Sequence, residues 1–212
     1  MSRFSGKPLL RGHFHLAAFF VAIGACSMLV ARTHANRNLI AAIIYSLSLV
    51  GMFGVSALYH RPKWGDTARQ WMKRLDHSAI YVLIAGTGTP ICLLALPFSI
   101  GVMLFATIWF AAACGVLKSL FWTHSPKMVS AILYVGVGWI YVYYARSIAL
   151  AVGTRSFVLL VLGGLIYTAG AVIYALKRPN PSPTYFGYHE IFHVLVIIAA
   201  AMHFMVIDSL VR

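Results

Sequence analysis

Seven long apolar runs constrain the fold of this chain more than any other feature. They cover residues 12–31, 38–60, 76–96, 98–118, 128–146, 156–176 and 187–211, and each is close to the roughly 20 residues that a helix needs to cross a bilayer. Hydrophobic residues make up 61% of the sequence and charged residues 10%, which exceeds the apolar share of soluble domains. Because backbone polar groups must be satisfied within lipid, the runs predict an all-α integral membrane protein, a bundle of seven transmembrane helices.

The predicted helices form one domain over residues 1–212, because no linker or repeat divides the sequence. The first run has no cleavage signature and is predicted to be a span rather than a signal peptide. The stretch 76–118 is too long for one span, which predicts a break at Leu96-Pro97-Phe98-Ser99. Within the third run, Pro90 is predicted to interrupt the helix, and the nearby Gly86 and Gly88 to allow close helix packing.

The basic residues predict the orientation, because Lys and Arg are retained on the cytoplasmic side of short loops. Five of them fall on one side: Arg32, Arg37, Arg146, Arg155 and Arg212. Twelve fall on the side of the N-terminus: Arg3, Lys7, Arg11, Arg61, Lys63, Arg69, Lys73, Arg74, Lys118, Lys127, Lys177 and Arg178. We therefore expect a multi-pass protein of the cell membrane with a cytoplasmic N-terminus and an external C-terminus. Topology accounts for the net charge of +13 without a nucleic-acid partner, and attraction to anionic lipid headgroups follows from it.

Histidines near the ends of the predicted helices are candidates for a site. His189 and His193 are four residues apart, so they lie on one helix face at a spacing that suits two ligands of one metal ion. Ionisable groups inside a span are costly and by default functional. If the helices alternate in direction, the end of the second helix, with His60, and the start of the third, with Asp76, lie at the same membrane face as this pair.

Three imidazoles with an open fourth position are the ligand set of a catalytic zinc site, where a bound water has a pKa of about 7. One zinc per chain is therefore predicted at His60, His189 and His193. Asp76 is suited to accept a hydrogen bond from the water or to orient a ligand, and Ser56 lies one turn before His60. The plainer interpretation is that these histidines only bridge helices by hydrogen bonds.

Together these motifs resemble the hemolysin III proteins, which belong with the progestin and adipoQ receptor family and, more distantly, the alkaline ceramidases. The resemblance rests on Ser-x-x-x-His ending at His60, Leu-Asp-x-Ser around Asp76, and His-x-x-x-His at 189–193 followed by an Ala-rich stretch and His203. One departure concerns the first helix, where the family often has Glu-x-x-Asn-x-x-Thr-His and residues 8–15 keep only the final histidine, His15.

The resemblance implies a seven-helix membrane fold with zinc held by His60, His189 and His193. It also implies that Asp76 holds the zinc water with Ser56 beside it, and that a membrane lipid with an amide linkage, such as a ceramide, is hydrolysed. Because these ligands lie near the membrane interface, we expect a cavity to open near the turn 56–60 and the start of the seventh helix. An apolar continuation of this cavity into the bundle would hold an acyl chain.

Two other functions stay open at this point. His189-Glu190-Ile191-Phe192-His193 matches the His-Glu-x-x-His pattern of zinc metalloproteases, with Glu190 as the base, although this leaves His60 and Asp76 unexplained. Alternatively, the metal only clamps helices in a non-catalytic protein, which the family name would make a cytolytic or pore-forming one.

His203 lies ten residues beyond His193, about 15 Å along the helix axis. It cannot share that metal and is predicted to be a buried hydrogen-bonding residue. Three cysteines, Cys26, Cys92 and Cys114, are predicted to be small packing residues rather than disulfide partners or ligands.

Overall fold

Seven α-helices account for most of the residues that the structure describes, which are 8–34, 36–122 and 124–212. In this computed structural model they are α1 (His13–Ala31), α2 (Asn36–His60), α3 (Asp66–Pro90), α4 (Phe98–Phe121), α5 (Lys127–Tyr143), α6 (Ala145–Leu176) and α7 (Tyr188–Val211). Apart from an isolated bridge between Ser182 and Phe186, the same ranges contain no β-structure. The predicted all-α fold is confirmed, while Arg3 and Lys7, which entered the orientation argument, lie outside the described residues.

The length and apolar character of the helices fit a membrane protein. Within the described part of the chain, six helices are long and apolar enough to cross a bilayer. The remaining helix, α5, is apolar but has 17 residues. A helix satisfies its own backbone hydrogen bonds, so it can lie in an apolar solvent. Such a solvent would also cover the many large hydrophobic side chains that are exposed among the described residues.

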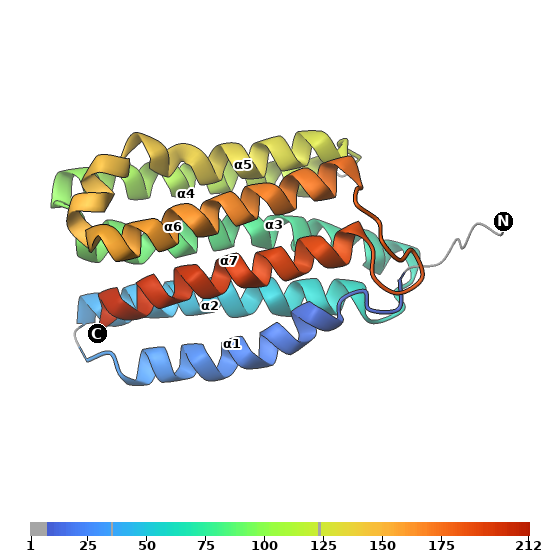
Figure 1. The fold of residues 1–212 in the computed structure, drawn as a ribbon, viewed down its shortest axis with the longest axis horizontal. Helices are drawn as coiled ribbons and strands as arrows, with labels where there is room; N and C mark the ends of the chain where they lie inside the picture. The colour runs from blue at the N-terminus through green and yellow to red at the C-terminus, as the bar shows by residue number, and fades with distance from the viewer. Residues whose placement is uncertain (1–7, 35, 123) are drawn as a thin grey trace.

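The helices run side by side, and α7 lies in the middle of the bundle (Figure 1). It contacts α1, α2, α3 and α6. Between the helices the core is closely packed, and Tyr45, Tyr81, Leu104, Ile108 and Ile207 are at most 1% exposed. Because α7 touches helices from both halves of the chain, residues at its start can meet residues from several other helices.

One end of the bundle brings together one end of each of the seven described helices (Figure 1). The starts of α1, α3, α5 and α7 meet the ends of α2, α4 and α6 there, and we call it the histidine end because it contains His60 and His189. The loop 177–187 covers α1 at this end. The Leu9 N–H donates to the Thr184 carbonyl at 2.9 Å, and Phe14 packs edge-on against Phe186.

Two helices start earlier than the apolar runs predicted. α3 begins at Asp66 rather than near residue 76, because its first turns carry charged side chains that an apolar pattern does not detect. α6 begins at Ala145 rather than near residue 156 and includes a break at Gly153, whose φ of 77° and ψ of 162° glycine tolerates readily. Apolar runs locate the lipid-facing part of a helix, and the helix itself continues beyond it.

The predicted interruptions around the third helix are confirmed. Regular α-helix ends at Pro90, which lacks an N–H, and a π-helical segment η1 (Ile91–Ala95) follows. The chain then turns at Leu96 and Pro97 before α4 starts. Close packing is also found before the proline, since a Cβ added to Gly86 would lie 2.5 Å from the Cβ of Ser48.

This close contact between α2 and α3 gives a test of the packing. We expect Gly86→Ala to lower the free energy of unfolding by about 1–3 kcal/mol, because the new methyl group overlaps Ser48. Gly24→Ala on α1 is the matched control, since no atom lies within 4 Å of its added Cβ and alanine is the better helix former. Thermal unfolding of detergent-purified protein measures both, and equal melting temperatures for the two variants would contradict the packing described.

Candidate metal centre

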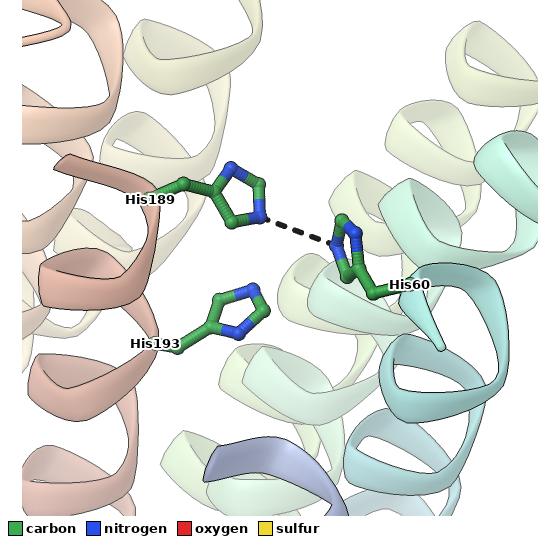
Figure 2. Close-up of side chains that lie close together, drawn as sticks. All are labelled: His60, His189 and His193. Carbon is green, nitrogen blue, oxygen red and sulfur yellow. Dashed lines mark hydrogen bonds between the residues drawn. The ribbon is translucent and has the colours of Figure 1, made fainter. Parts of the chain in front are cut away.

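Three buried histidines from two helices face one another at the histidine end (Figure 2). His60 is the last residue of α2, and His189 and His193 lie on the first two turns of α7. One ring nitrogen from each lies within 4.8 Å of the other two, and the Nε2 atoms of His60 and His189 are 3.2 Å apart. The structure thus brings together the three histidines that helix alternation predicted, in a group that could hold a metal ion.

The local sequence explains how α7 presents two of these rings. Gly187 adopts an extended conformation and starts the helix, so His189 and His193 follow one turn apart on the same face. The three imidazoles are 2–8% exposed, and Nδ1 of His193 is buried without a hydrogen-bond partner among the residues described. A buried ring nitrogen without a partner is costly. A cation held between the three rings would bind one nitrogen of each.

The predicted polar partners lie beside the histidines. Asp76 Oδ2 is 3.9 Å from His60 Nε2 and 4.0 Å from His77 Nδ1. Ser56 is buried one turn before His60 and is close enough to hydrogen-bond the Asp76 carboxylate. The arrangement places a carboxylate and a hydroxyl next to the histidine cluster, and their roles stay predictions.

His15 also belongs to the site, although residues 8–15 depart from the family pattern and gave little reason to expect it there. Its Nδ1 shares a 2.8 Å hydrogen bond with Ser56 Oγ, and its ring stacks on His193 with centroids 3.7 Å apart and planes 7° apart. The signal was present, since the start of the first helix lies at the same end of an alternating bundle as the end of the second. His15 therefore holds both Ser56 and a candidate metal ligand in place.

Glu190 has a structural role at the start of α7. The Gly187 N–H donates to Glu190 Oε2 at 2.8 Å, and Arg11 Nε donates to Oε1 in an ion pair. Glu190 is fully buried, whereas the Arg11 side chain is 16% exposed. Both carboxylate oxygens are thus engaged: Oε2 caps the start of α7, and Oε1 joins it to the residues before α1.

A cavity of about 460 Å³ leads from the histidines into the bundle between α3, α5, α6 and α7. Its polar lining is at the histidine end and includes Asp76, Lys73 and Lys127, whereas its deeper lining is mostly apolar and reaches Val142 and His203. The distance along α5 from Lys127 to Val142 corresponds to about 20 Å. The apolar cavity predicted to continue into the bundle is therefore present.

The predictions for the remaining residues are confirmed in part, because His203 is hydrogen-bonded but only partly buried and Cys114 is exposed. His203 Nε2 donates to the Leu160 carbonyl at 3.1 Å, as expected of a hydrogen-bonding histidine away from the metal ligands. Cys26, Cys92 and Cys114 are free thiols, the first two buried and the third exposed.

Comparison with known proteins identifies the family. Residues 5–204 match the Haemolysin-III related family. Similar proteins include a Hemolysin-3 homolog of Bacillus subtilis, 30% identical over 82% of this chain and 79% of the relative, and Hemolysin-3 of Bacillus cereus, 28% identical over 96% and 91%. The human Monocyte to macrophage differentiation factor is 27% identical over 79% of this chain and 69% of its own length. With its apolar helices and buried histidines, this chain belongs to the haemolysin III-related family of multi-pass integral membrane proteins.

Proposed function

We propose that this protein is a zinc-dependent hydrolase of lipid amides. The observation that carries the proposal is the position of three buried histidines and Asp76 at the polar end of a long, mostly apolar cavity. A lipid could place its polar linkage among these residues and its acyl chain in the cavity. A site that only clamps helices would need no such cavity.

The donor set fits zinc. Two nitrogens bound to a tetrahedral zinc at about 2.0–2.1 Å lie about 3.3 Å apart, close to the 3.2 Å between the Nε2 atoms of His60 and His189. His193 is the third ligand, and its nitrogen lies within 4.8 Å of the other two. When bound, zinc would supply Lewis acidity and an acidified water to this position.

The side chains around the histidines have different roles in the proposed reaction. Water attacks the amide carbonyl carbon, the C–N bond breaks, and a carboxylic acid and an amine leave. Asp76 accepts the proton of the attacking water and passes it to the leaving amine. Ser56 donates a hydrogen bond to the carbonyl oxygen or the water, and His15 orients Ser56 through their 2.8 Å hydrogen bond.

The membrane arrangement belongs to the same proposal. With α5 also spanning, residues 1–212 form a single seven-helix domain with a cytoplasmic N-terminus and an external C-terminus, in the cell membrane. The histidine end then lies at the cytoplasmic face, where a lipid of the inner leaflet can reach it. The excess of Lys and Arg on this side supports that orientation.

The experiment combines elemental analysis with an assay for released acyl groups. Protein purified in detergent is incubated with ceramides of short and long acyl chain, and free fatty acid is measured by mass spectrometry before and after metal removal. We expect about one zinc per chain, and turnover that is lost on chelation and restored by zinc. Zinc without turnover of any lipid amide would leave a helix clamp as the function.

A glycine that lines the cavity tests the acyl-chain site. Gly138 on α5 borders the cavity and no atom lies within 4 Å of a Cβ added there, so Gly138→Leu fills cavity space without a backbone clash. We expect turnover of long-chain ceramides to fall about tenfold and that of short-chain ceramides to change little. Gly136→Leu is the control, because Gly136 is equally open but does not line the cavity. The same loss for both chain lengths would argue against this site.

A further inference from the structure

A second, smaller pocket lies beside the large cavity at the histidine end. It has a volume of about 60 Å³ and lies between α3, the end of α4 and the start of α5. The pocket and the cavity share Lys73, His77, Lys127 and Tyr174, but the three candidate metal ligands do not line it. One water needs about 10–15 Å³ of such space, so the pocket accommodates a group of about four to six heavy atoms.

Four cations line this pocket. Lys73 and Arg74 come from α3, Lys118 from α4 and Lys127 from α5, and the three lysines are near enough to His77 to act on it electrostatically. Among its described lining residues there is no carboxylate. Like charges that converge in this way repel one another, and an anion among them would offset that repulsion.

The pocket also offers hydrogen-bond donors. Lys118 Nζ donates to Ser125 Oγ at 2.6 Å and to Ser130 Oγ at 2.7 Å, and the two hydroxyls are 3.2 Å apart. Each hydroxyl therefore accepts a hydrogen bond from Lys118. Only one of the two serines can donate its O–H to the other. At least one serine O–H is thus left to donate to an acceptor in the pocket. Arg74 Nε is buried and has no hydrogen-bond partner in the described part of the structure.

The first turn of α5 adds to this positive environment. The helix starts at Lys127 after Pro126, and no described side chain caps its first N–H groups. Its positive dipole end and its free N–H groups thus lie beside Lys127 and Ser130. The preference for basic residues in cytoplasmic loops explains why cations gather at one end of the bundle, but it does not explain why Lys118 is held inward by two serines.

We propose that this pocket binds a phosphate group. Phosphate has the size of the pocket, carries the required negative charge and presents several acceptor oxygens, and lysine binds it as a point charge. The group comes either from the head of a phospholipid or from free phosphate. Because the pocket contains none of the candidate metal ligands, the proposal does not depend on the hydrolase activity.

Binding is measured on the full-length protein in detergent after treatment with a chelator, so that phosphate cannot bind through a metal. The probes are inorganic phosphate, short-chain phosphatidic acid and, as the lipid without phosphate, the matching diacylglycerol. We expect a phosphate-bearing probe to bind and to raise the melting temperature, and diacylglycerol to do neither. Binding of phosphatidic acid alone assigns the pocket to a lipid head, and equal binding of inorganic phosphate assigns it to the free ion.

Lys118→Met and Lys127→Met should each raise the Kd of the phosphate probe about tenfold or more, since each removes a charged donor. Lys63→Met is the matched control, because Lys63 is an exposed lysine of the α2–α3 loop that lines neither cavity, and it should bind like the wild type. Ser130→Ala provides a milder variant that removes one hydroxyl and no charge. The proposal is overturned if no phosphate probe binds the wild type, or if both lysine variants bind as tightly as Lys63→Met.

Discussion

His193→Ala is expected to lose nearly all bound zinc, from about one ion per chain to less than about one tenth. Loss of a residue that only supports a ligand lowers metal affinity about 10- to 100-fold, and loss of one of three ligands costs at least that much. A 100-fold weaker affinity also removes up to about 2.7 kcal/mol of stabilisation by the metal. Elemental analysis and thermal unfolding with and without chelator measure the two effects.

His203→Ala is the control on the same helix. His203 hydrogen-bonds the Leu160 carbonyl and lies outside the histidine cluster, so its loss should lower stability without changing the zinc content. His60→Ala and His189→Ala should behave like His193→Ala. Full zinc occupancy in any of these three variants would show that the substituted histidine is not a metal ligand.

Asp76→Asn should reduce lipid hydrolysis about 10²- to 10⁴-fold while zinc stays bound, because asparagine cannot accept the proton of the attacking water. Glu190→Gln separates this mechanism from that of a metalloprotease. It should leave zinc and turnover per folded molecule unchanged and lower the free energy of unfolding by up to about 3 kcal/mol, since it breaks a largely buried ion pair with Arg11. The glutamine carbonyl can still accept from the Gly187 N–H.

The two variants are compared in the same fatty-acid assay, with zinc content and melting temperature measured on each preparation. Retained hydrolysis in Asp76→Asn together with its loss in Glu190→Gln would favour the protease mechanism. Hydrolysis that survives both changes would mean that neither carboxylate is the base. A melting temperature unchanged by Glu190→Gln would contradict a stabilising role for the ion pair with Arg11.

Much of the fold was predictable from the apolar runs, because a bilayer imposes a minimum length on each of them. The break at Leu96-Pro97 and the close packing at Gly86 followed from residue chemistry alone. The starts of α3 and α6 did not. The turns after Asp66 are helical but charged, and the break at Gly153 separates the first part of α6 from the apolar run. Hydropathy reports the solvent around a helix rather than its full extent.

The meeting of His60 with His189 and His193 was predictable, because in an alternating bundle the end of the second helix and the start of the seventh lie at the same surface. The ion pair between Arg11 and Glu190 was not, because it joins residues 179 positions apart and no local pattern encodes it. The stacking of His15 on His193 likewise depends on how closely α1 approaches α7, which alternation does not specify.

The engagement of Glu190 at the start of α7 also bears on how a short motif should be interpreted in other chains. In this protein the acidic residue of the His-Glu-x-x-His pattern occupies the third position of a helix, where its carboxylate reaches back to the N–H of the residue before that helix. The same five letters in the middle of a helix would leave that carboxylate free for chemistry. A search for the pattern therefore gains discriminating power if it also records how far each match lies from the beginning of its helix.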